Sequence, residues 1–128
     1  MRHDLFADAL SIIKNAEAVG KTEAVVPANK VIKNFLEVLK NENYIGSYEF
    51  VDDGKSGFFK VGLIGKINNC RAIKPRFAVK AGEFEKWERR FLPASGFGVL
   101  VVSTSKGIMT HEEAKEKNLG GRLLAFVY

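Results

Sequence analysis

The stretch FGVLVVSTSKGIMTHEEAKEKNLGGRLLAFV, residues 97–127, predicts a strand, a loop, a helix and a second strand. Its first part, 97–103, is apolar and rich in β-branched residues, which predicts a buried strand. Thr110 and Glu113 have the spacing of a capping box, in which the threonine hydroxyl accepts a hydrogen bond from the N–H of the glutamate, so a helix begins there. Residues 123–127 form another apolar run and predict a closing strand.

The rest of the C-terminal half adds strand segments and one more helix. The capped helix is expected to end at Asn118, with Gly120-Gly121 as a left-handed stop. Upstream, residues 68–73 and 76–80 indicate two strand segments that a proline interrupts. Residues 83–91 carry aromatic side chains at helical spacing and predict a short helix. We therefore expect this half to be mostly β, with a capped helix before the last strand.

The N-terminal half predicts the order α-β-α-β-β. Its expected elements are a helix over 5–16, a strand over 22–26, a helix after residue 29, and strands over 48–51 and 58–64. Asp4 and Asn29 are placed to cap the two helices, and Pro27 ends the first strand because it lacks a backbone N–H. The composition changes between the halves without a flexible linker. We therefore predict an α+β protein with two domains, 1–65 and 66–128.

The composition excludes several classes of protein. A chain of 128 residues with 46% hydrophobic side chains is long enough for one domain or two very small ones, and too short for a large multidomain enzyme. No apolar run approaches the roughly 20 residues that span a bilayer. Cys70 cannot form an internal disulfide, which fits a reducing cytosol, and with His3 and His111 it leaves too few ligands for a structural zinc site. We expect a cytoplasmic protein without a metal or other cofactor.

The positive charge of the chain is concentrated in one half. Residues 1–65 carry a net charge of −1 and residues 66–128 a net charge of +6. The window 66–80 contains five basic side chains and no acidic one. Such asymmetry suggests an anionic partner that the C-terminal half engages. A solubilising surface explains the same distribution equally well.

Five residues between the buried strand and the capped helix, Ser103-Thr104-Ser105-Lys106-Gly107, are the strongest candidate for a binding loop. Three hydroxyls in a row are unfavourable in a core, since each would need a hydrogen-bond partner there. In a loop they present donors and acceptors beside the Lys106 ammonium, which suits phosphate oxygens, ribose hydroxyls and base edges. The alternative is an ordinary turn in which the hydroxyls cap the local backbone.

Catalysis is a weaker interpretation of the same loop. Ser103 and Lys106 have the spacing of the Ser-x-x-Lys nucleophile of penicillin-binding enzymes, but the partner motifs of those enzymes are missing from the chain. A phosphate-binding loop of the Gly-x-x-x-x-Gly-Lys type is missing too. We therefore predict a protein that is not an enzyme. The alternative is a small cytosolic enzyme with Ser103 or Ser105 as nucleophile, for which no Ser/His/Asp arrangement can be argued.

Motifs spread over the whole chain point to one family. They comprise Ser103–Thr110, Leu119–Tyr128, the N-terminal residues Asp4, Ala7-Asp8, Leu10, Ile13 and Asn15-Ala16, and the junction Pro27–Lys30. Together they resemble the signature of the ribosomal protein S8 family of the small subunit. The segment Phe84–Trp87 and the ending Leu123–Tyr128 are similar to the archaeal and eukaryotic branch rather than the bacterial one.

This resemblance implies a fold and a partner. It implies two small α/β domains packed together, which bind the central domain of small-subunit, 16S-type ribosomal RNA early in assembly and help to build the platform of the subunit. Neighbouring ribosomal proteins are the other implied partners, and neither a membrane nor a small-molecule substrate is implied. Bacterial members have a tyrosine in the strand that reads Phe77-Ala78-Val79 here, so its stacking contact is not transferred.

The resemblance also implies particular RNA contacts. It implies that the loop 103–107 enters the minor groove of an irregular RNA helix, and that the Asn29-Lys30 junction and the start of the first helix approach the RNA backbone. By position, Lys55, Lys74 and Arg76 are further phosphate contacts, although a solvated face explains these three equally well. The predicted RNA-binding residues are Asp4, Asn29, Lys30, Lys55, Lys74, Arg76, Ser103, Thr104, Ser105, Lys106, Gly107 and Gly121.

The remaining notable side chains are expected to be structural. Most of the aromatic residues in patterned segments should lie in the core; these are Phe35, Phe58, Phe59, Trp87, Phe91, Phe97 and Phe126. His111 is expected in the first turn of its helix without a chemical role, and Cys70 as a small apolar strand residue.

Overall fold

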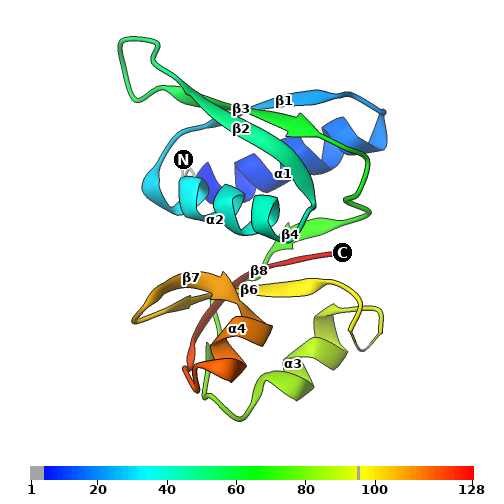
Figure 1. Cartoon of the computed structure of the whole chain (residues 1–128), viewed down its shortest axis with the longest axis vertical. Coiled ribbons are helices and arrows are strands. Elements are labelled where there is room, and N and C mark those ends of the chain that lie inside the picture. The colour runs from blue at the N-terminus through cyan, green and yellow to red at the C-terminus, as the bar shows by residue number, and fades with distance from the viewer. Residues whose placement is uncertain (1–4, 95) are drawn as a thin grey trace. The chain divides into compact units, whose positions relative to one another are not determined.

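A computed structural model describes residues 5–94 and 96–128 of the chain (Figure 1). It divides into two compact units, one that ends at Cys70 and one that comprises Arg71–Tyr128. Each unit combines helices with a β-sheet, so the predicted α+β class is confirmed. Among the described residues no helix is both long and apolar enough to cross a membrane.

The first unit has the predicted order α-β-α-β-β. Its elements are α1 (Leu5–Ala18), β1 (Glu23–Pro27), α2 (Lys30–Asn41), β2 (Ile45–Val51) and β3 (Phe58–Leu63). Strand β3 is the central strand of a three-stranded sheet and pairs antiparallel with both β1 and β2. Pro27 lies at the end of an edge strand, where its lack of a backbone N–H does not cost the sheet a hydrogen bond.

Both helices of the first unit cover one face of this sheet (Figure 1). They do so because their apolar residues recur at three- and four-residue spacing. The buried side chains are Phe6, Ala9, Leu10, Ile13 and Ala16 of α1 and Ile32, Phe35, Leu36, Val38 and Leu39 of α2. The rings of Phe6 and Phe35 meet edge to face, with centroids 5.1 Å apart. The predicted cap of α2 is confirmed, since Asn29 Oδ1 accepts a hydrogen bond from the Ile32 N–H at 2.8 Å.

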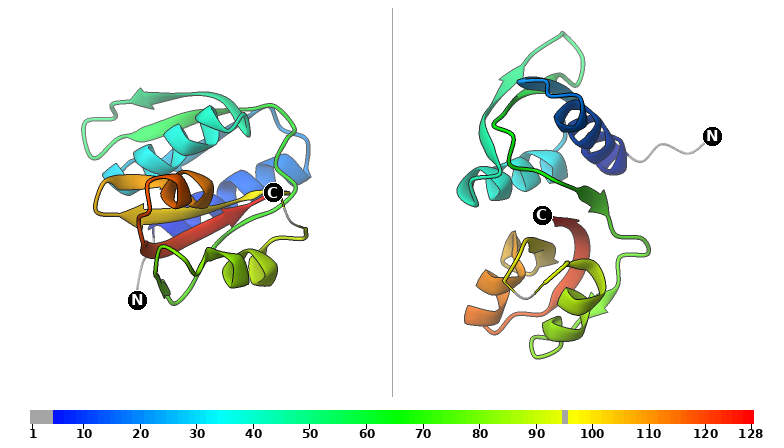
Figure 2. Two further views of the ribbon diagram at one scale, coloured as in Figure 1. Left: turned by 60° about the horizontal axis from the view of Figure 1, so that its bottom comes forward. Right: turned by 90° about the vertical axis from the view of Figure 1, so that its right-hand side faces the viewer.

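The second unit is built around a mostly antiparallel β-sheet. Strand β4 of this sheet begins at Cys70, the last residue of the first unit. The elements are β4 (Cys70–Ala72), β5 (Ala78–Val79), α3 (Phe84–Phe91), β6 (Val99–Thr104), β7 (Gly107–Thr110), α4 (His111–Glu116) and β8 (Gly121–Val127). The strand order is β4-β8-β6-β7, and β5 also pairs with β8 (Figure 2). The capped helix before the last strand is confirmed, because Thr110 Oγ1 accepts from the Glu113 N–H at 3.2 Å.

Three details of the second unit differ from the prediction. Strands β4 and β5 are shorter than the expected segments 68–73 and 76–80, because only a few residues around the Lys74-Pro75 bend are able to pair with β8. The side chain of Glu113 does not close the capping box but forms an ion pair with Lys117 at 3.1 Å. Strand β7 was not predicted, since its four residues are too few to show a period.

The two glycines after α4 do not terminate it as predicted. The left-handed residue is Asn118, with φ of 55°, whereas neither Gly120 nor Gly121 has a positive φ. Both glycines instead allow close approach of neighbouring backbones. A Cβ atom on Gly120 would lie 2.6 Å from the carbonyl oxygen of Val79, and one on Gly121 would collide with the carbonyl oxygen of Ser103. The double glycine is therefore required by the pairing of β8 with β5 and β6.

The expected burial of the aromatic residues is correct for most of them. Phe35, Phe59, Trp87 and Phe126 are buried, and Phe58 and Phe91 are half-buried. The exception is Phe97, which is 46% exposed because β6 begins only at Val99 and residue 97 belongs to the preceding turn. Cys70 is buried as predicted, and its thiol lies 3.4 Å from the carbonyl oxygen of Leu10.

Candidate nucleic-acid interface

The predicted binding loop is the tip of a β-hairpin. Ser103 and Thr104 end β6, and Gly107 begins β7 with φ of 116°. The pairs Ser103–Ile108 and Thr104–Gly107 continue the ladder up to the tip, which consists of Ser105 and Lys106. The loop expected between a strand and a helix is therefore a two-residue turn between two strands.

Hydrogen bonds of Thr104 shape the turn. Its hydroxyl accepts from the N–H of Lys106 at 3.1 Å and donates to the carbonyl oxygen of Gly107 at 2.8 Å. The hydroxyl thus serves the local backbone, as the alternative interpretation of the loop expected. Ser105 and Lys106 are exposed, and neither side chain has a hydrogen-bond or ion-pair partner among residues 5–94 and 96–128. The hairpin therefore presents one hydroxyl and one ammonium group on a fixed turn.

Strand β8 supports the hairpin from the other side of β6. Thr104 lies opposite Gly121 and Ser103 lies opposite Arg122 in the ladder between these strands. Because Gly121 has no side chain, its backbone can approach the carbonyl group of Ser103 at the base of the hairpin. Of the predicted RNA-binding residues, the five of the hairpin and Gly121 are therefore brought together.

Arg122 is a basic residue of this region that sequence reasoning missed. It is exposed, it pairs with Ser103 in the ladder, and its guanidinium donates to the carbonyl oxygen of Arg76 at 3.3 Å. This contact brings the predicted residue Arg76 next to Arg122. Arg76 therefore lies towards the end of strands β6 and β8 at which the hairpin is found. The available signal was its position directly after the double glycine in the basic half of the chain. Lys74 is exposed on the bend before β5, outside the ladder that brings the hairpin residues together.

The predicted residues of the first unit lie on two of its junctions. Asn29 caps α2 through its amide oxygen, and Lys30 is the first residue of that helix and is exposed. Lys55 lies in the turn between β2 and β3, where its N–H donates to Asp53 Oδ1 at 2.9 Å. These residues therefore expose two ammonium groups. Asp4, also predicted, lies outside the described residues.

His111 has a structural role that was not predicted. Its side chain is 1% exposed, and its Nδ1 accepts a hydrogen bond from the N–H of Leu100 at 3.0 Å. The ring proton therefore lies on Nε2, which donates to Glu88 Oε1 at 3.0 Å. The second oxygen of Glu88 accepts from Lys115 Nζ at 2.7 Å. This network joins α3, α4 and β6, the strand that ends in the hairpin.

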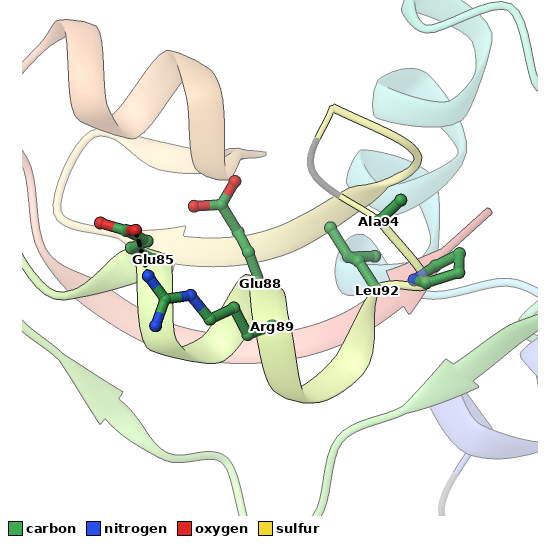
Figure 3. A pocket seen from close by; sticks show the side chains of 6 residues that line it. Glu85, Glu88, Arg89, Leu92 and Ala94 are labelled. Atoms are coloured by element: carbon green, nitrogen blue, oxygen red, sulfur yellow. Dashed lines mark hydrogen bonds and ion pairs between the residues drawn. The ribbon is translucent and has the colours of Figure 1, made fainter.

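Electrostatics favours the charged form of Glu88. Burial raises the pKa of its carboxyl, but the hydrogen bonds from Lys115 and His111 and the charge of Lys115 outweigh burial and hold that pKa below the ordinary value. A hollow of about 390 Å³ beside α3 contains Glu88 together with Glu85 and Arg89 (Figure 3). Its carboxylates are already used, since Glu85 pairs with Arg89 and Glu88 with Lys115. Among the described residues that line the hollow, neither carboxylate is therefore left unpaired as a general acid or base.

The other groups with catalytic potential are also engaged or inert. Both nitrogens of His111 have partners, so the imidazole is not available to activate Ser103 or Ser105. Burial raises the pKa of the Cys70 thiol to about 12, which leaves almost no thiolate at neutral pH. Among the described residues, no group of three or more His, Cys, Asp or Glu side chains could hold a metal ion.

Comparison with known proteins gives a consistent result. A family model described as Ribosomal protein S8 matches residues 4–128. The chain is also 58% identical over 126 residues to the small ribosomal subunit protein uS8 of Methanococcoides burtonii, a match that covers 98% of this chain and 97% of that protein.

Proposed function

Because this chain belongs to the ribosomal protein S8 family, it is a structural protein of the small ribosomal subunit rather than an enzyme, and we propose that it binds the central domain of small-subunit ribosomal RNA. The resemblance read from its motifs, including the archaeal-type ending, is confirmed by these relatives. Binding would occur early, as a primary step in building the platform of the subunit. Ribosomal RNA and neighbouring ribosomal proteins are its partners.

The β6–β7 hairpin supports this proposal most directly. A-form RNA has a wide, shallow minor groove that displays 2′-hydroxyls and is recognised largely by shape. The exposed Ser105 hydroxyl is short enough to approach such a groove closely, and Lys106 beside it can contact a phosphate. Thr104 fixes the turn in advance, so little backbone freedom is lost when RNA binds. The hairpin would therefore bind RNA according to the shape of the groove. Ser103 in β6 and Gly107 at the start of β7 would contribute the backbone on either side of the tip.

The basic side chains would supply affinity that does not depend on sequence. In the domain 66–128 these are Lys74, Arg76 and Lys106, and Arg122 joins them because it contacts the Arg76 carbonyl. In the domain 1–65, Asn29, Lys30, Lys55 and the segment at Asp4 would approach the RNA backbone. Each phosphate neutralised releases counterions, so each true contact contributes about one unit to the slope of log affinity against log salt.

Footprinting and affinity measurements test the proposal together. The protein alone should protect one irregular helix in the central domain of small-subunit ribosomal RNA. Ser105→Ala should weaken binding by about 1–3 kcal/mol if its hydroxyl is desolvated against RNA, and Lys106→Gln should lower the salt slope by about one unit. Ser47→Ala, an exposed serine in β2, is the matched control. Absence of protection, or a Ser105→Ala variant as tight as the control, would contradict the proposal.

A further inference from the structure

We propose that the first unit carries a base-stacking site, in which an unstacked RNA base lies on the ring of Phe50 while Lys30 and Lys33 contact the adjoining phosphates. The site is a hollow between the start of α2 and the β2–β3 hairpin. The inference rests on the proposed function, because it takes the RNA ligand as given. It adds a second, chemically different contact that neither the motifs nor the family resemblance assigned.

The hollow lies entirely within one unit. It has a volume of about 440 Å³, and its lining includes Asn29, Lys30, Lys33, Phe50, Ser56 and Phe59. This volume falls in the range of sites that bind small organic groups, about 300–1,000 Å³. Figure 1 shows the β2–β3 hairpin extending past the helices that cover the sheet.

Phe50 is the exposed aromatic residue of the hollow. It lies directly opposite Phe59 in the β2–β3 ladder, so the two side chains are on the same face of the sheet. Tyr48, on the same face, is covered by α2, because its hydroxyl donates to Glu37 Oε1 at 3.0 Å. Phe50 follows two residues later, beside the first turn of α2, and remains 54% exposed. Position 50 is therefore on the helix-covered face of the sheet, yet its aromatic ring is exposed to solvent.

The ring of Phe50 is nevertheless held in one place. Its centroid is 5.7 Å from that of the buried Phe59, at an interplanar angle of 66°. On another side it lies over the backbone of Gly57, where a Cβ atom would come within 2.5 Å of the ring carbons Cε1 and Cζ. Gly57 also has φ of 82°, so both its backbone conformation and the closeness of the Phe50 ring favour glycine at this position. An exposed ring that is supported on two sides suits stacking on a base, because less side-chain freedom is lost than for an unsupported ring.

Charge in the hollow favours a nucleotide over an apolar peptide. Lys30 and Lys33 lie three residues apart on α2 and therefore on the same side of that helix. Both are exposed, and within the described part of the chain neither forms an ion pair. The nearby acidic side chains close the β2–β3 turn: Asp52 accepts from Gly54, and Asp53 accepts from Lys55 and Gly57. An aromatic face beside two ammonium groups that have no ion-pair partner among the described residues matches a base with its adjoining phosphates.

Substitutions at Phe50 separate stacking from simple burial. Phe50→Leu keeps an apolar side chain but removes the ring, whereas Phe50→Tyr keeps the ring. Because the side chain is half-exposed, both variants should fold, which circular dichroism would check. With a central-domain RNA fragment, Phe50→Leu should bind about 5- to 150-fold more weakly and Phe50→Tyr nearly as tightly as the parent protein. Val25→Ala, an equally exposed apolar residue of β1, is the control and should bind normally.

Two further measurements decide between the possible occupants. Lys33→Gln should lower the salt slope by about one unit, while Lys40→Gln, at the other end of α2, should leave it unchanged. A photoreactive phenylalanine analogue at position 50 should cross-link to a nucleotide in the assembled subunit. If it cross-links to a ribosomal protein and not to RNA, the base-stacking site is wrong.

The outcome for this site is distinguishable from the outcome for the proposed function. If Ser105→Ala weakens RNA binding but Phe50→Leu binds like the parent protein, the hairpin contact stands and the stacking site is refuted. If the parent protein binds no ribosomal RNA, both the proposed function and the base-stacking site are refuted. If the two variants are each weaker and Phe50→Tyr is not, both ideas are supported.

Discussion

Substitution of Gly121 by alanine should disturb the β6–β7 hairpin although the sequence of the hairpin itself is unchanged. The added Cβ would collide with the carbonyl oxygen of Ser103, and it would lie 2.9 Å from the carbonyl carbon of that residue and 3.0 Å from Val102 Cγ1. The nearest obstacle is backbone in a paired strand, so no side-chain rotation relieves the contact. Either β8 moves away from β6 at this point or the base of the hairpin is displaced.

The expected loss of stability has two sources, overpacking and broken hydrogen bonds of the ladder. Overpacking of this type destabilises a protein by about 1–3 kcal/mol, and each ladder hydrogen bond that is broken adds about 1 kcal/mol. We therefore expect Gly121→Ala to lower the free energy of unfolding by about 2–4 kcal/mol in urea titrations followed by circular dichroism. Since Thr104 lies opposite Gly121, the turn should shift as well. RNA affinity should then fall more than tenfold even where the variant is fully folded.

Gly82→Ala is the matched control for this experiment. Gly82 belongs to the same unit and has no positive φ, and a Cβ added there would meet no atom within 4 Å, so alanine should be neutral or stabilise the fold by up to about 1 kcal/mol. If Gly121→Ala proves as stable as Gly82→Ala, the close approach of β8 to β6 has been overstated. If it is less stable but binds RNA with unchanged affinity in the folded state, β8 does not position the hairpin.

Two further predictions concern titratable groups that are wholly or partly buried. The lowered pKa of Glu88 means that its ion pair with Lys115 and its hydrogen bond from His111 stabilise the fold above the ordinary glutamate pKa, and that this contribution is lost as pH falls through the lower folded-state value. Glu88→Gln should therefore be less stable than the parent protein at neutral pH, with a smaller difference at low pH in the same urea titrations. If the difference is independent of pH, Lys115 and His111 do not stabilise the carboxylate. Cys70, whose pKa is raised to about 12 by burial, should react with an alkylating reagent at pH 8 only as fast as the protein unfolds, and rapid labelling of the folded protein would contradict its placement.

Features that depend on neighbouring residues could be predicted from the sequence. The caps of α2 and α4 follow from Asn29 and Thr110, because the capping oxygen and the N–H it accepts from are three residues apart. Helix α3 follows from the spacing of its aromatic residues, and its predicted range 83–91 differs from the observed one by a single residue. Local chemistry therefore accounts for the order of the elements other than β7, and places many of their boundaries within about two residues.

Features that depend on distant residues could not be predicted. The roles of Gly120 and Gly121 follow from which carbonyl groups lie opposite them, and the sequence does not contain that register. The same holds for His111, whose partners Leu100 and Glu88 belong to two other elements. Sequence reasoning could identify Ser105 and Lys106 as candidate ligand contacts, but it could not tell that Thr104 is consumed by the turn.

If the β6–β7 hairpin binds RNA as proposed, the arrangement of β6 would let the hairpin tip discriminate between RNA shapes. A mobile loop would lose backbone freedom of about 1–2 kcal/mol per residue on binding, and that loss would be similar for every RNA it could wrap around. Here β6 lies between β7 and β8, is anchored to α4 and α3 through His111, and ends in a turn fixed by the Thr104 hydroxyl. Because the turn is fixed before binding, an RNA groove of the wrong width would leave Ser105 unpaired or force a clash with it. A rigid turn would therefore make binding depend on the shape of the RNA, whereas the surrounding positive charge, which any RNA would attract, would raise affinity without weakening that dependence.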